Sequence, residues 1–172
     1  MCRLLAAVVT VMLVGATLIG CAGTSLTAVR PFEQSLNPYQ AVYFTAEPMV
    51  TEDITQELSD LEQLVALSLN EQAIFKSAKL GPCTENCDHA LLVTATITDI
   101  NKVSSSARFF GGAFAGKASM TADVVFADAG RGDTLAVYTV KGKSGGTGLS
   151  GGTESAVNRT AKAIVELIQA NY

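Results

Sequence analysis

The segment 91–98, which reads Leu-Leu-Val-Thr-Ala-Thr-Ile-Thr, decides the fold class of this chain. Its apolar residues alternate with threonines, and a period of two is typical of a β-strand with one buried face. The apolar side consists of Leu91, Val93, Ala95 and Ile97, and the other side of Thr94, Thr96 and Thr98. A second segment repeats the alternation with Met120, Ala122, Val124 and Phe126. The two segments therefore predict two half-buried strands with a threonine-lined outer face.

Further strands are predicted on both sides of this pair. Residues 128–133 (Asp-Ala-Gly-Arg-Gly-Asp) have the composition of a turn, and 134–141 then forms the returning strand of a hairpin. Upstream, residues 41–46 are rich in Val, Tyr and Phe and predict a short strand that Pro48 ends.

A first helix follows that short strand. Its apolar residues recur at spacings of four, three, four and four, at Ile54, Leu58, Leu61, Val65 and Leu69. Thr51 is expected to cap this helix, with the acidic residues 52 and 53 in its first turn. Gly81 and Pro82 end the helix after Leu80 at the latest.

A second helix is predicted at the end of the sequence. Its inner face consists of Val157, Ala161, Ile164, Val165 and Ile168. Thr153 is expected to cap its start, and Glu154 lies favourably in its first turn. The order β-α-β-β-β-α predicts an α+β fold, a small and mostly antiparallel sheet with two helices on one face. The other face is then either solvated or available to a partner.

The first twenty residues have the composition of a bacterial signal peptide. Arg3 gives a positive start, and the apolar run that follows is shorter than the roughly 20 residues that a permanent membrane helix needs. The run ends in Leu18-Ile19-Gly20-Cys21, which matches the lipobox of bacterial lipoproteins. We therefore expect cleavage before Cys21 and lipid on its thiol. Ala22 stands where an aspartate would signal retention in the inner membrane, which favours a periplasm-facing anchor in the outer membrane.

Three regions follow from this interpretation: a signal peptide (1–20), a lipidated N-terminus with a flexible tether (21–38) and a periplasmic α+β domain (39–172). Without Arg3, 11 Lys and Arg face 16 Asp and Glu. Nucleic-acid binding needs clustered positive charge, so this acidic balance argues against it and against binding anionic lipid through charge.

Cys83 and Cys87 are the thiols that remain after lipidation of Cys21. In an oxidising compartment a disulfide is the expected state, while a metal or redox role and unpaired thiols stay open as alternatives. The three residues between the cysteines differ from the two-residue spacing of the thioredoxin motif. His89 is the single histidine, and no nucleophile or carboxylate pair is placed near it. We expect no catalytic residues, no metal site and no cofactor.

Two glycine-rich segments are the remaining unusual features. Residues 142–153 contain Gly-Lys-Ser, but a phosphate-binding loop places this triplet directly at the helix start. The segment is a flexible connection, an anion site at the helix start or a loop that orders against a partner. Between the predicted strands, Phe109, Phe110 and Phe114 lie in a glycine-rich stretch. They either pack onto the core or form a patch for protein or lipid. With Leu149 they are the candidate partner-contact residues.

The sequence resembles a family of small bacterial lipoproteins, the domain of unknown function DUF4410. The resemblance lies in the segments 108–112 and 115–118, the strand ends 125–130 and 140–144, the glycine-rich loop and the alanine-rich final helix. The element order is also similar to the αβ domain of the TolB amino-terminal region and the curli secretion lipoprotein. Those domains act through assembly and protein contacts, and a shared fold alone does not establish a function.

We therefore expect a non-enzymatic envelope lipoprotein that is held to the membrane by its lipid. It would bind another envelope protein or form a homo-oligomer. The alternative is a periplasmic module that binds a small ligand or anion through residues 142–153.

Overall fold

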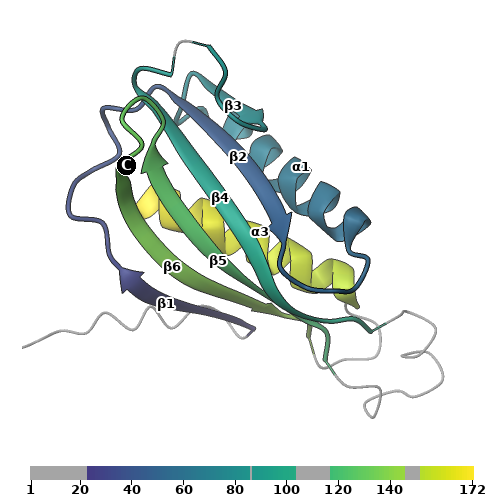
Figure 1. Ribbon diagram of the computed structural model, residues 1–172. Helices are drawn as coiled ribbons and strands as arrows, with labels where there is room; N and C mark the ends of the chain where they lie inside the picture. The colour runs from purple at the N-terminus through teal and green to yellow at the C-terminus, as the bar shows by residue number, and fades with distance from the viewer. Residues whose placement is uncertain (1–22, 86, 104–116, 146–151) are drawn as a thin grey trace, which may run out of the picture.

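The computed structural model describes residues 23–85, 87–103, 117–145 and 152–172. Within them, six strands form one sheet, and both helices pack on the same face of it (Figure 1). The elements are β1 (Thr24–Arg30), β2 (Ala41–Pro48), α1 (Thr55–Glu71), β3 (Ser77–Leu80), β4 (Ala90–Asn101), β5 (Ser119–Asp128), β6 (Thr134–Lys143) and α3 (Thr153–Ala170). The predicted α+β class is confirmed.

The strand order in the sheet is β1-β6-β5-β4-β2-β3. Strands β4, β5 and β6 form an antiparallel meander, as the sequence predicts, and β1 extends it antiparallel to β6. Strand β2 runs parallel to both β4 and β3, so the sheet is mixed. A tight hairpin cannot join parallel strands, and α1 makes the connection out of β2.

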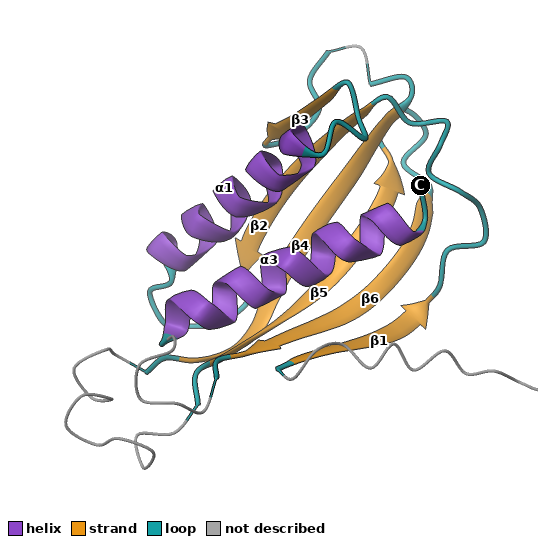
Figure 2. Cartoon of the chain, turned by 180° about the vertical axis from the view of Figure 1, so that it is seen from behind, coloured by secondary structure: helices purple, strands orange, loops and turns teal. Residues whose placement is uncertain are grey.

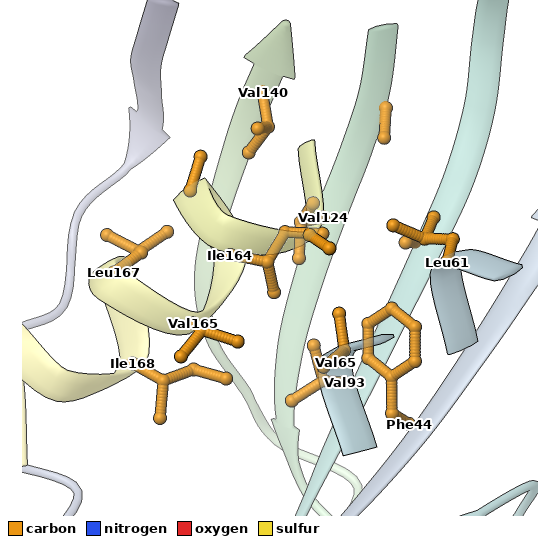
Figure 3. Packing of buried hydrophobic residues seen from close by; sticks show 14 of the residues in the cluster. Phe44, Leu61, Val65, Val93, Val124, Val140, Ile164, Val165, Leu167 and Ile168 are labelled. Carbon is orange, nitrogen blue, oxygen red and sulfur yellow. The ribbon is translucent and has the colours of Figure 1, made fainter. Parts of the chain in front are cut away.

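The core lies between the sheet and the two helices. Figure 2 shows both helices in front of the strands, and Figure 3 shows the apolar side chains that meet between them. Among the fully buried residues are Val93 of β4, Val124 of β5, Leu61 of α1 and Ile164 of α3. The alternation in β4 and β5 and the helical spacing in α1 and α3 are confirmed, because the predicted apolar faces of all four elements contribute to this core.

The start of α1 differs from the prediction. The helix begins at Thr55, so Thr51 lies outside it and does not cap it. The carboxylate of Asp53 instead accepts hydrogen bonds from the Thr55 amide (3.1 Å) and the Thr55 hydroxyl (2.8 Å). The buried side chain of Ile54 places the chain against the core immediately before the helix, and that contact sets the helix start.

At the start of α3, the residue before the helix is Gly152, and Thr153 makes no capping hydrogen bond to the helix. Its hydroxyl accepts the Val103 amide instead, at 3.1 Å. Glu154 lies in the first turn as expected.

The predicted flexible tether is replaced in large part by folded structure. Residues 24–30 form strand β1, and the side chains of Leu36 (0% exposed) and Tyr39 (4% exposed) are buried in the core. The ring of Phe32 packs against that of Phe126 in a tilted arrangement, with centroids 4.9 Å apart. This segment has no local periodicity because its order comes from pairing with β6, more than a hundred residues away in the sequence.

Strand β3 has no counterpart in the sequence-based prediction. Helix α1 ends at Glu71, and Ala73 adopts a left-handed backbone conformation with φ of 51°. Phe75 then enters the core, and the chain returns as β3 beside β2. The four-residue strand is too short to show a pattern of its own.

Helix α3 approaches β6 most closely at Gly142. A Cβ atom at this position would clash with the Ala156 carbonyl oxygen and would lie 2.5 Å from the Thr160 hydroxyl and 2.8 Å from the Thr160 amide nitrogen. Two of these atoms belong to the helix backbone, so they cannot rotate away. The absence of a side chain at residue 142 therefore allows α3 to lie directly on the sheet.

At the opposite end of the sheet, Asp128 ties the β5–β6 turn to the segment before β2. Its Oδ1 accepts the amides of Gly130 (3.0 Å) and Arg131 (2.9 Å), and its Oδ2 accepts the Tyr39 hydroxyl at 3.0 Å. The Arg131 guanidinium lies 3.0 Å from the same Oδ2. Burial raises the pKa of Asp128, but the Arg131 amide, the Tyr39 hydroxyl and the Arg131 charge outweigh it, so the pKa lies below its usual value.

We expect Gly142→Ala to destabilise the protein by about 2–3 kcal/mol, because the added methyl group pushes α3 off the sheet. The control is Gly130→Ala. The nearest atoms to a Cβ there lie at 3.4 Å, and we expect a change within about 0.5 kcal/mol. Urea unfolding of both variants measures the difference. Equal stability of the two variants would contradict the close contact.

We expect Asp128→Asn to cost about 2 kcal/mol at neutral pH, since it removes the charge from these hydrogen bonds. Because the pKa of Asp128 is lowered by folding, its contribution is present above the pKa of an unfolded aspartate, about 4, and disappears as the pH falls through the folded-state value. The difference between wild type and variant should therefore shrink below pH 4. Asp133→Asn, on the same turn but exposed, is the control and should behave as wild type.

Candidate interaction surfaces

Most of the candidate site residues lie outside the described part of the chain. This applies to the lipidation residue Cys21 and to the candidate contact residues Phe109, Phe110, Phe114 and Leu149. Their predicted roles stay predictions. The residues that flank the two glycine-rich segments are described, and they show where both segments leave the fold.

Both segments leave from the same end of the sheet. Just before the first segment, the Val103 amide donates to the hydroxyl of Thr153, the last residue of the second segment, at 3.1 Å. After the first segment, the Ala118 amide donates to the Ser144 hydroxyl at 2.9 Å, and the Ser144 amide donates to the Ala118 carbonyl at 2.8 Å. These bonds hold the flanking residues side by side, a proximity that the sequence pattern did not show.

The glycine and the serine of the Gly-Lys-Ser triplet pack inside the fold. Gly142 lies under α3, and Ser144 is 3% exposed with its hydroxyl bonded to the Ala118 amide. The hydroxyl of Thr153 at the helix start is also engaged, by Val103. The hydroxyls of Ser144 and Thr153 therefore have structural partners, whereas the Lys143 side chain is exposed.

The predicted disulfide between Cys83 and Cys87 is present, with Cα atoms 5.9 Å apart, and lies between β3 and β4. His89 is exposed just before β4 and has a left-handed backbone conformation with φ of 58°. Its carbonyl accepts the Gln40 amide at 2.8 Å, so the residue shapes the turn into β4. In the ranges that the structure describes, no three His, Cys, Asp or Glu side chains come together as a metal site would require.

The helix-free face of the sheet is the broadest surface, and in Figure 1 no described helix lies in front of it. Threonines 94, 96 and 98 of β4 are half-buried on this face, as the alternation predicts. Neighbouring polar groups bond across strands: the Thr139 hydroxyl donates to Asp123 (2.7 Å), and Lys141 lies 3.5 Å from Asp99. These cross-strand pairs lie on a face that is open to water or to another protein surface.

The two edges of the sheet are protected differently. At the β3 edge, the side-chain amide of Asn70 donates to the Ala78 carbonyl (3.1 Å) and accepts the Ala78 amide (2.9 Å). Glu62 accepts the Ala46 amide of β2 at 2.9 Å. Strand β1, at the other edge, has no such cover from described residues, and Val29 is 67% exposed there. An uncovered edge strand is a site where another chain can add.

The described surface also has shallow hollows. One, of about 300 Å³, lies between α1 and α3 and includes Leu64, Leu67 and Asp60. Another, of about 520 Å³, is polar and lies beside Arg30, Arg131 and Asp133.

Neither helix in the described ranges is both long and apolar enough to cross a membrane. A comparison with curated protein sequences finds no match.

Solved structures with a similar fold include PelC from Paraburkholderia phytofirmans, crystallised as a dodecamer. The likeness has a TM-score of 0.57 at 11% sequence identity, and it covers 84% of this chain and 96% of PelC. A dodecamer of a single-site variant of the same protein gives a TM-score of 0.56 with the same identity and coverage. At this identity, the likeness establishes the fold.

Residues 33–148 match the family described as "Domain of unknown function (DUF4410)". The match spans both glycine-rich segments up to residue 148 and all strands except β1. The resemblance noted in the sequence is thereby confirmed, and the chain belongs to the DUF4410 family.

Proposed function

We propose that this chain is a lipid-anchored, non-enzymatic subunit of the bacterial envelope that works by binding copies of itself. The observation that carries the proposal is the likeness of its fold, over 84% of the chain, to PelC, whose solved structures are dodecamers. An assembly larger than a dimer needs at least two contact surfaces on each copy. The helix-free face and the β1 edge are two such surfaces on this chain.

The proposed anchor rests on the lipobox at residues 18–21, which would place a lipid on Cys21 after export. Ala22 favours the outer membrane, with the domain in the periplasm. The disulfide between Cys83 and Cys87 fits an exported protein, because structural disulfides persist in oxidising compartments.

Contact surfaces support a binding role better than a catalytic one. On the helix-free face the Thr139 hydroxyl pairs with Asp123 and Lys141 pairs with Asp99, and the one histidine is exposed at a turn. The described β1 edge differs from this face, because backbone groups of an edge strand can pair with an added strand. A protein with these features binds another protein through the contact area of a sheet face and through backbone hydrogen bonds along an edge strand.

We expect the full lipidated chain, purified in detergent, to have a mass of several copies when it is measured by light scattering with the detergent contribution subtracted. Dilution into the nanomolar range should shift the distribution towards the monomer, by mass action. A strictly monomeric chain at micromolar concentration would contradict self-assembly.

Photo-cross-linking in the native envelope tests the same proposal with positional detail. We expect a cross-linker at Thr27 of β1, at Thr96 of the helix-free face, or at the loop residues Phe110 and Leu149 to give a band at twice the monomer mass. The buried Val93 is the control and should stay silent. Bands that contain only a different protein would favour a heterologous envelope partner and would argue against a homo-oligomer.

A further inference from the structure

The chain enters the folded domain at one corner of the sheet. The carbonyl of Gly23 accepts the amide of Lys143, the last residue of β6, and β1 begins at the next residue. Only Ala22 lies between Cys21 and Gly23, and a fully extended chain spans about 7 Å from the first Cα atom to the last. A lipid on Cys21 would therefore hold this corner directly at the membrane surface.

The corner belongs to a well-defined end of the sheet. The strand register aligns Asn101, Ser119 and Lys143 across β4, β5 and β6. The residues that flank both glycine-rich segments lie at this same end. The β5–β6 turn with Asp133 lies at the opposite end, about 35 Å away along the twelve residues of β4.

Positive side chains gather at the corner even though the chain as a whole is acidic. Lys117 and Lys143 are exposed there, and the Arg159 guanidinium of α3 lies against Gly23. At the same end of the sheet, Lys141 pairs with Asp99 and Lys102 with Glu57, which neutralises two of the nearby acids. Lysines close to a bilayer are attracted to anionic lipid headgroups.

We propose that this end of the sheet rests on the bilayer, with Lys117 and Lys143 among anionic headgroups, while the β5–β6 turn points away from the membrane. The proposal rests on the lipid anchor of the proposed function and adds the orientation and the surface that touches the lipid. The acidic overall charge argues against binding anionic lipid through charge. The fold nevertheless concentrates lysines where the chain would meet the membrane.

The test uses the full lipidated chain in vesicles of phosphatidylcholine with one third phosphatidylglycerol. The disulfide and the lipid occupy the cysteines of the mature chain, so an introduced cysteine is the single free thiol. We expect a dye on Asn101→Cys to be strongly quenched by quencher-labelled lipids and a dye on Asp133→Cys to be almost unaffected. Asn101 is exposed and three strands away from β1, so its quenching reports on the whole end of the sheet.

The charge contribution is tested with Lys117→Gln/Lys143→Gln in the Asn101→Cys background. In the anionic vesicles, some anchored molecules have the sheet end on the bilayer and others have it detached. We expect the ratio of the first population to the second to fall about fivefold for each lysine that is replaced. In pure phosphatidylcholine the double variant should match the parent. Lys76→Gln/Lys79→Gln, near the start of β2, is the matched control and should leave the quenching unchanged.

The outcomes separate the two proposals. A mature chain whose mass shows no lipid on Cys21 would overturn the anchor and this orientation together. An acylated, vesicle-bound chain with equal quenching at Asn101 and Asp133 would overturn the orientation alone. Quenching at Asn101 that is insensitive to both lysines would overturn the headgroup contact. The number of copies in detergent, which is measured separately by light scattering, tests only self-assembly.

Discussion

The structure depends on one constraint: the sheet has a single covered face, so all of its apolar core lies between that face and two helices. Strands β4 and β5 therefore direct their fully buried apolar side chains to that face, as Val93 and Val124 do. The thickness of this layer is set where α3 meets β6 at Gly142, because a side chain there would hold the helix away. Both described helices lie on one face, so the other sheet face is open to water or to a partner.

The uncovered face and the edges follow from the same constraint. Polar cross-strand pairs such as Thr139 with Asp123 satisfy the uncovered face, and Asn70 of α1 covers the β3 edge. Helix α1 lies over the β2–β3 side, while β1 at the far edge receives no comparable side chain from the described residues. The exposure of the described β1 edge thus results from where the two helices lie.

With the proposed lipid on Cys21, the attachment of β1 would give the domain a direction relative to the membrane. A flexible tether of 18 residues would let the domain turn freely, whereas pairing of Thr24 with Gly142 brings the first described residues onto the sheet. The end that carries Gly23 is also the end where Val103 bonds Thr153 and Ala118 bonds Ser144. The segments that were candidates for partner contact and the start of the chain therefore share one end of the molecule.

The sequence by itself determined the elements whose order is local. Alternation over residues 91–98 and 120–126 and the helical spacing from Ile54 to Leu69 each reflect one buried face, so the pattern alone predicted the α+β class. The cysteine spacing and the expected compartment likewise predicted the disulfide. Tertiary structure decided the rest: β1 and β3 are ordered by neighbours far away in the sequence, and Asp128 meets Tyr39 across 89 residues. No local pattern encodes such pairings, because their free energy comes from contacts that exist only once the sheet has formed.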